Sequence, residues 1–307
     1  MNPSSQTARS GVMFGLSAYS LWGCFPLYFA LFQGIPAAEV VLHRVVWSCV
    51  FLAIVVSVLR RWPAIRQAMA NPKGLIWVAG CALLIALNWG VYIYAVETRH
   101  VLQASLGYFL TPLVNIALGM LLLQERITRL QGISVALAAT AIVYQLARLG
   151  DVPWIALMLA LSFGGYGLMR KRVTLDGLTG LFAETLLLAP FSLVILAYLA
   201  VTNAGHFTDS RETALLLMSS GIVTAVPLLL FAGAARRLRL ATIGFLMYIN
   251  PTLQFFIGWH LFNEPLTSEQ LISFALVWCA LAIYSWSAWQ NRPTAATKPT
   301  RPLSPRP

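Results

Sequence analysis

The chain has 307 residues, of which 59% are hydrophobic and 10% are charged, and its formal net charge is +11. Since soluble domains contain about 25% charged residues, this composition excludes a soluble protein with an ordinary charged surface. The apolar residues form ten blocks of roughly the ~20 residues that a helix needs to cross a bilayer. In chain order these blocks are residues 11–32, 37–59, 74–96, 101–123, 130–147, 152–169, 177–201, 213–235, 240–261 and 267–289.

We expect all ten blocks to be transmembrane helices, because open sheet edges cannot lie in lipid and barrel strands would alternate polar and apolar residues. The first block begins after ten residues and has no convincing cleavage site, which predicts a retained helix and not a signal peptide. The longest connections, residues 60–73 and 202–213, are predicted to be loops that hold no domain. The basic, Pro-rich residues at the end predict a disordered cytoplasmic tail.

Lys and Arg residues gather on one side of this ten-helix arrangement. Seventeen fall there, and only Arg99, Arg148 and Arg211 fall on the other side. The positive-inside rule then predicts that both termini are cytoplasmic, as in a multi-pass protein of a bacterial-type inner membrane. The basic charge follows from topology, so we expect the lipid bilayer and no nucleic acid as a partner. The four cysteines lie in apolar blocks without ligand spacing, so no metal or cofactor site is predicted.

One unit of sequence occurs twice, always 139 residues apart. Each copy holds five blocks, an odd number, so the second copy enters the membrane from the opposite face, which predicts inverted repeats. We therefore expect an all-α membrane protein with an N-terminal segment at 1–10, a first repeat at 11–147, a second at 150–289 and the tail at 290–307. The clearest recurring residues are Pro112, Gly119, Glu125, Thr128, Gln131 and Ser134, which return as Pro251, Gly258, Glu264, Thr267, Gln270 and Ser273.

These recurring residues are interpreted as scaffold. Glu125 and Glu264 each precede a Thr at a helix-to-helix turn, and we expect both to cap the next helix. Pro112 and Pro251 fall within paired blocks and predict kinks. The kinks are either bending points for alternating access or passive curvature around a cavity.

Block two contains Glu39, His43 and Arg44, and an ionisable group inside a bilayer costs about 2.5 to 3.5 kcal/mol on insertion scales. Arg44 is predicted to face the central cavity and to bind an anionic group of the substrate or a coupled carboxylate, with an architectural role as the alternative. His43 is a further candidate binding residue, although a packing hydrogen bond is the plainer interpretation. Glu39 lies near the start of the block, at the outer boundary of the membrane, and is expected to be structural.

Glu184 is the only acidic residue well inside an apolar block, and subtracting the offset places it next to Arg44 in the repeat. A carboxyl group surrounded by hydrocarbon takes up a proton readily, which suits Glu184 to substrate binding and to proton coupling in antiport. A structural hydrogen bond to a neighbouring helix is an equal alternative. A direct pair with Arg44 is compatible with the sequence but not implied by it.

Further candidates for the substrate site are polar or aromatic residues in apolar blocks. Together they predict an aromatic lining for a flat or amphipathic small molecule, while core packing and helix bridging are the alternatives for each one. They are Trp47, Asn88, Tyr92, Tyr108 and Tyr166.

Several strings in the chain resemble the RarD-type permeases, a branch of the drug/metabolite transporter superfamily with two EamA-type repeats. The resemblance covers nearly the whole chain outside the tail. It implies a ten-helix inner-membrane permease, grouped by name with chloramphenicol sensitivity, and implies no particular substrate. The strings are EVVLHRVVWS at 39–48, NWGVYIYAV at 88–96, SLGYFLTP at 105–112, SFGGYGLMRK at 162–171, ETLLLAP at 184–190, TAVPLLLFAGAARR at 224–237 and residues 244–267.

The sequence contains no HExxH, GxSxG or Walker A motif, so we expect neither an enzyme nor an ATP-driven pump. The predicted function is secondary transport of a small molecule by alternating access, as gradient-coupled export of a metabolite or drug-like compound. Protons are the hypothesised coupling ion. A channel, or a protein of the same fold that translocates a lipid or lipid precursor, stays open as the alternative.

Overall fold

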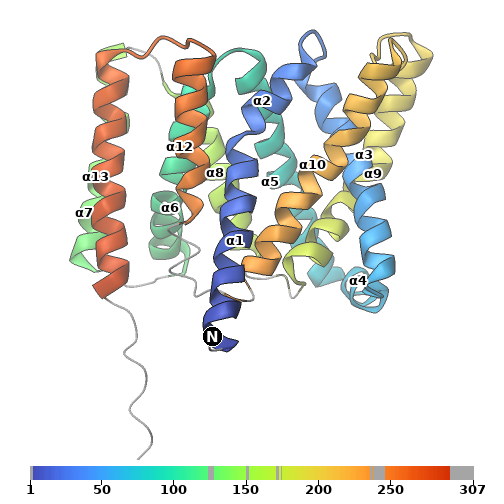
Figure 1. Cartoon of the computed structure of the whole chain (residues 1–307), viewed down its shortest axis with the longest axis horizontal. Helices are drawn as coiled ribbons and strands as arrows, with labels where there is room; N and C mark the ends of the chain where they lie inside the picture. Colours follow the sequence, from blue (N-terminus) through green and yellow to red (C-terminus); the bar gives the residue numbers. More distant parts are fainter. Residues whose placement is uncertain are drawn as a thin grey trace, which may run out of the picture.

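The computed structural model describes residues 3–123, 128–149, 152–170, 173, 175–235, 237 and 246–290, and these residues contain helices and no strand. The helices run side by side, with α7 and α13 at one edge and α3, α9 and α10 at the other (Figure 1). The helical segments are α1 (Pro3–Gly23), α2 (Phe25–Phe29), η1 (Ala30–Phe32), α3 (Ala37–Val58), α4 (Trp62–Ala70), α5 (Pro72–Glu97), α6 (Val101–Leu123), α7 (Arg129–Leu149), α8 (Trp154–Arg170), α9 (Gly177–Val201), α10 (Arg211–Ala235), α12 (Ile249–Phe256), η2 (Ile257–Leu261) and α13 (Ser268–Gln290).

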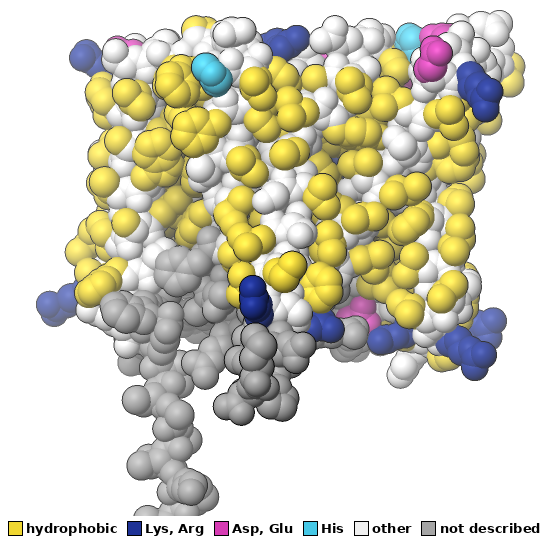
Figure 2. All heavy atoms as spheres, in the orientation of Figure 1, with side chains coloured by type: hydrophobic (Ala, Val, Ile, Leu, Met, Phe, Trp, Pro, Cys, Tyr) yellow, Lys and Arg dark blue, Asp and Glu magenta, His cyan; other side chains and the backbone are white. Residues whose placement is uncertain are grey.

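Six of the described segments are long and apolar enough to cross a membrane, and two shorter apolar helices accompany them. Figure 2 shows hydrophobic side chains covering the middle of the visible face, between two rims that carry the charged residues and histidines. Large apolar side chains at 59–83% exposure would be costly in water, but lipid accommodates them. Examples are Ile54, Phe191, Val194 and Val201. This distribution is that of a multi-pass membrane protein.

Two predicted boundaries need correction. Residues 60–73 are not only a loop, because they contain α4, whose Ile65 is 2% exposed and whose Trp62 ring meets Phe182 edge-on at 5.5 Å. This short helix exists because it can bury one apolar face against α9. The first block is also not one straight helix. α1 ends at Gly23, where a Cβ would lie 2.7 Å from the Leu253 side chain, and α2 begins at Phe25.

The turns before α7 and α13 have the same hydrogen bonds. The Thr128 amide donates to Gln131 Oε1 at 3.0 Å, and the Gln131 amide donates back to Thr128 Oγ1 at 3.2 Å. Thr267 and Gln270 repeat this reciprocal cap at 3.1 and 3.2 Å. Each pair satisfies two helix-start amides that would otherwise lack an acceptor. The recurring Thr and Gln residues are therefore helix caps.

The predicted role of Glu264 is wrong, since its carboxylate caps α6 and not the helix that follows it. Val101 N donates to Oε1 at 2.7 Å and Leu102 N donates to Oε2 at 2.8 Å. Gly258 explains the approach, because a Cβ there would lie only 3.2 Å from Leu102 N. The chain after η2 thus passes over the start of α6, which helix order alone does not reveal. Glu125 lies outside the described residues.

Candidate functional site

Arg44 lies on α3 and is 3% exposed. Its Nε donates to Thr224 Oγ1 of α10 at 2.8 Å. Three ring faces surround the guanidinium carbon, with Trp89 at 4.1 Å, Phe29 at 5.2 Å and Phe25 at 5.7 Å. Within the described part of the chain, Arg44 has no carboxylate partner within 4.0 Å. Aromatic faces and one hydroxyl group therefore hold the cation, and no described acidic residue neutralises it.

A wall of aromatic rings leads away from this cation. Phe29 meets Tyr92 at a centroid distance of 6.0 Å, and Tyr92 meets Tyr108 at 5.8 Å. Phe163 follows at 6.3 Å from Tyr108, and Tyr166 at 5.9 Å from Phe163. The rings come from α2, α5, α6 and α8, so contacts between four helices build one continuous surface. Three of the predicted aromatic site residues lie on it.

Asn88 holds the middle of the aromatic wall in place. Its Nδ2 donates to the Leu159 carbonyl at 3.1 Å and to Ser162 Oγ at 3.0 Å, and its Oδ1 accepts from the Tyr108 hydroxyl at 3.3 Å. Asn88 is 1% exposed, so these bonds satisfy a buried amide. This geometry gives Asn88 a positioning role, between α5, α6 and α8.

Glu184 on α9 lies at the far end of the wall and is fully buried. The Tyr166 hydroxyl donates to its Oε2 at 3.2 Å, and Arg170 Nη1 donates to its Oε1 at 3.3 Å. Arg170 also donates to the carbonyls of Leu175 and Asp176 at 3.2 and 3.1 Å. The structure therefore pairs Glu184 with Arg170 and not with Arg44.

The sequence did not single out Arg170 as a site residue, because it stands beside two further basic residues at a helix end. Such a cluster is typical of a solvated cytoplasmic boundary. Its side chain instead turns inward over Gly180, where an added Cβ would collide with the guanidinium group. The nearby Asp176 caps α9 through Leu178 N and Thr179 N and forms an exposed ion pair with Arg61 at 3.1 Å.

His43 and Trp47 lie away from the aromatic wall, beneath the connection between α9 and α10. The Phe207 ring of that connection stacks on His43 at 5.0 Å and on Trp47 at 6.3 Å. Gly221 lets α10 approach the backbone of Trp47, since a Cβ there would overlap it. The ring nitrogens of both residues are buried and have no hydrogen-bond partner among the described residues.

The same connection is fastened by Glu39. The His206 amide donates to Glu39 Oε1 at 2.7 Å, and His206 Nδ1 lies 2.7 Å from Oε2. The hydrogen bond to Glu39 raises the pKa of His206, although partial burial of the ring acts in the opposite direction. Glu39 thus ties the α9–α10 connection to the start of α3. The sequence carried no signal for this contact, which joins residues 167 positions apart.

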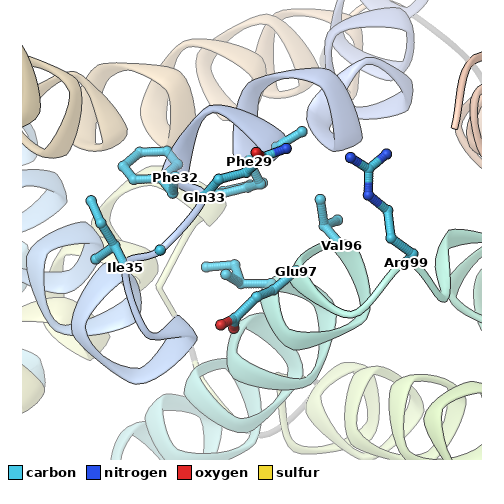
Figure 3. Close-up of a pocket in the computed structure, with 10 residues that line it drawn as sticks. Phe29, Phe32, Gln33, Ile35, Val96, Glu97 and Arg99 are labelled. Atoms are coloured by element: carbon cyan, nitrogen blue, oxygen red, sulfur yellow. The ribbon is translucent and has the colours of Figure 1, made fainter.

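A pocket of about 330 Å³ opens at the end of the molecule opposite the start of α1. Figure 3 shows Phe29, Phe32 and Gln33 on one side of it and Val96 and Glu97 on the other. Glu97 also accepts a bond from Ala37 N at 3.2 Å. Phe29 therefore contacts both places, because it lines this pocket and its ring centre lies 5.2 Å from the Arg44 guanidinium carbon.

A bundle of apolar helices that exposes large apolar side chains and buries charged ones defines a polytopic membrane protein. Residues 9–146 match the model of the EamA-like transporter family. Protein RarD of Escherichia coli strain K12 is 42% identical over 92% of this chain and 96% of its own length. The chain belongs to the EamA-like transporter family and is a RarD-type permease.

Other relatives cover the chain to a similar extent. An uncharacterized transporter of Vibrio cholerae is 43% identical, over 93% of this chain and 95% of its own length. The uncharacterized transporter YojE of Bacillus subtilis is 40% identical, over 91% of this chain and 94% of its own length. A solved crystal structure with 19% identity covers 92% of this chain and 98% of its own, with a TM-score of 0.54, and supports the fold alone. The protein is a multi-pass bacterial-type inner-membrane permease.

Proposed function

We propose that this protein is a secondary transporter that exports a small molecule by alternating access and performs no catalysis. The observation that carries the proposal is the aromatic wall between Arg44 and Glu184, because it joins two oppositely charged buried groups on different helices. Substrate would contact the residues predicted from the sequence, directly or through the positions they hold. These are Arg44, His43, Trp47, Asn88, Tyr92, Tyr108, Tyr166 and Glu184.

We also propose that the fold consists of ten helices in two inverted repeats. Helix packing supports this, because exchanging each helix with its counterpart 139 residues away maps the contacts onto one another. Packing of α6 on α8 corresponds to α12 on α1, and packing of α3 on α10 corresponds to α9 on α5. Two counterpart pairs, α3 with α9 and α7 with α13, pack directly. The repeated Thr–Gln cap agrees with this symmetry.

In this arrangement both termini are cytoplasmic, so the pocket beside Phe29 opens toward the periplasm. The count of basic residues supports this orientation through the positive-inside rule. Phe29 would then be a thin barrier between an outer vestibule and the Arg44 site. Exchange of access between the two sides requires this ring to move.

Glu184 is the proposed proton carrier. Its two partners, Arg170 and Tyr166, hold the ionised carboxylate, and protonation would weaken the bond to Arg170. Freed from Glu184, Arg170 would keep its bonds to two backbone carbonyls. Proton uptake would therefore change the contact between α8 and α9 while Arg170 keeps two hydrogen bonds.

The test is flux through the full-length protein in proteoliposomes, with and without an imposed pH gradient. Coupled transport predicts that a substrate accumulates against its own gradient only when the pH gradient is present. Flux that equilibrates without accumulation would favour the channel alternative. Movement of a lipid analogue between leaflets, without flux of water-soluble compounds, would favour the lipid-translocating alternative.

A further inference from the structure

We propose that the transported molecule is an organic monoanion, a carboxylate with an apolar body, whose charged group binds the Arg44 guanidinium. This inference rests on the proposed transport function and names its substrate class. It starts from the charge balance around one buried cation.

Arg44 is buried to 97% and shares its charge with no acidic residue in the described ranges. Burial of an isolated charge is costly unless it is paired or well hydrogen-bonded. The three rings around it supply cation–π attraction of about 0.5 to 2 kcal/mol each at most, and Thr224 supplies one hydrogen bond to Nε. Neither contact neutralises the cation, so the described residues leave the site without an anion.

Other arginines in the chain show what a structural pairing looks like. Arg170 bonds to Glu184 and two carbonyls, Arg61 pairs with Asp176, and Arg237 donates to the Gly233 carbonyl at 2.8 Å. Each of these side chains is bound by oxygen atoms at the end of its guanidinium fork. For Arg44 the described residues provide an oxygen partner at Nε only, which leaves the fork available for a bidentate carboxylate.

Two tyrosines meet the Phe29 ring that lies over Arg44. The ring centres of Tyr28 and Tyr92 lie 5.2 and 6.0 Å from that of Phe29. Tyr28 bonds to Ser219 and Leu216, whereas the buried Tyr92 hydroxyl has no partner among the described residues. A buried donor without an acceptor costs about 1 to 3 kcal/mol. An anion oxygen at Arg44 would satisfy it.

The residues around Arg44 also indicate the chemistry of the uncharged part of the substrate. Phe25, Phe29 and Trp89 present ring surfaces around the cation, and these favour hydrocarbon over further charge. The described contacts of Arg44 include no second basic group, and a single cation favours one negative charge over the two of a phosphate monoester. The neighbouring pocket of about 330 Å³ is of the size that holds small organic ligands.

The experiment uses the full-length protein in detergent and needs no known substrate. A bacterial small-molecule extract is separated by ion exchange into anionic, neutral and cationic fractions, and the thermal midpoint is measured with each. We expect the anionic fraction to raise the midpoint of the wild type. The rise should disappear in Arg44→Gln and persist in the control Arg66→Gln, which removes an exposed charge of the same kind.

A matched probe pair then isolates the charge. Phenylacetate should bind the wild type at least ~10-fold more tightly than phenylacetamide, which corresponds to about 1.4 kcal/mol. The preference should vanish in Arg44→Gln and be reduced but present in Arg44→Lys, which keeps the charge if the glutamine variant fails to fold. An equal response to the neutral fraction, no response to the anionic one, or an unchanged Arg44→Gln would overturn the inference.

The outcomes separate this inference from the transport proposal. Accumulation of a neutral or cationic compound driven by a pH gradient would overturn the anion class and leave secondary transport intact. Charge-dependent binding at Arg44 with no coupled flux in proteoliposomes would overturn secondary transport and leave the anion-binding site intact.

Discussion

Arg170 Nη1 lies 3.3 Å from Oε1 of the fully buried Glu184, so a cation at the end of the preceding helix pairs with the buried carboxylate. The pair connects the last residue of α8 to the interior of α9. Tyr166, one turn before Arg170, donates to the other carboxylate oxygen. The carboxylate is therefore held from one side by two residues of one helix.

Replacing Glu184 by Gln should abolish the pH dependence of transport, because the side-chain amide does not take up or release a proton in this pH range. Stability should also fall, by ~1 to 3 kcal/mol, since Arg170 loses its charged partner. Flux in proteoliposomes between pH 5.5 and 8.5 measures the first effect and thermal unfolding the second. Glu212→Gln, at an exposed glutamate of α10, is the control. A retained pH profile in the Glu184 variant would exclude this residue as the proton carrier.

Gly180→Ala should disrupt the same pair without removing any ionisable group. A Cβ at Gly180 collides with the Arg170 guanidinium, whereas at Gly177 it meets nothing within 4 Å. Gly177→Ala on the same helix is therefore the matched control. We expect a lower thermal midpoint and a shifted pH profile for Gly180→Ala only. Similar behaviour of the two variants would show that Arg170 moves aside at no cost.

Glu264→Ala should destabilise the protein by ~1 to 2 kcal/mol, because the first two amides of α6 lose their acceptor. Chemical or thermal unfolding in detergent is the measurement, and Glu212→Ala is the control at an exposed position. Glu264→Gln should recover part of the loss. Glutamine keeps one of the two side-chain oxygens, so it replaces the acceptor of only one of the two amides. If Glu264→Ala is as stable as the control, water satisfies these amides equally well.

His206→Gln should remove a pH-dependent part of the stability. The pKa of His206 is raised by its bond to Glu39, with Asp209 contributing in the same direction. A raised pKa means that the contribution is fully present below the unfolded value of about 6.5 and is lost as pH rises through the folded pKa. The midpoint difference between wild type and His206→Gln should therefore be larger at pH 6 than at pH 9.

Three titratable groups lie near His206 and bear on the interpretation of this pH dependence. Glu39 of α3 accepts from both its amide and its ring, His43 lies 3.9 Å from the same carboxylate, and Asp209 belongs to the connection itself. His100→Gln removes an exposed histidine elsewhere and serves as the control. A difference that does not vary with pH would mean that the connection is held by the His206 amide and Phe207 alone.

Much of the fold could be predicted because the bilayer imposes simple rules. The ten apolar blocks coincide closely with described helices, apart from the break at Gly23 and the part of block nine outside the described residues. A segment of ~20 apolar residues has few options in lipid, since every backbone group must be bonded internally. The short α4 escaped prediction because its helical form depends on burying Ile65 against a distant helix.

Part of the candidate site could be predicted from the sequence, and part could not. Arg44, Glu184 and the tyrosines could be selected from sequence because a polar group inside an apolar block is costly and therefore needs a reason. Their partners could not be selected in this way. Trp89, Phe29 and Thr224 are ordinary residues of apolar helices, and only packing places them around Arg44.

The sequence by itself determined that the chain crosses a membrane several times, that a set of residues recurs 139 positions apart, and that Arg44 and Glu184 lie within apolar blocks, because hydrophobic length and recurrence can be read along the chain. The tertiary structure decided which charges meet. It left Arg44 among aromatic rings, paired Glu184 with Arg170, and directed Glu264 to the start of α6 and not to the helix that follows it. Such pairings depend on helix rotation and approach, which are set by side-chain packing between segments far apart in the chain.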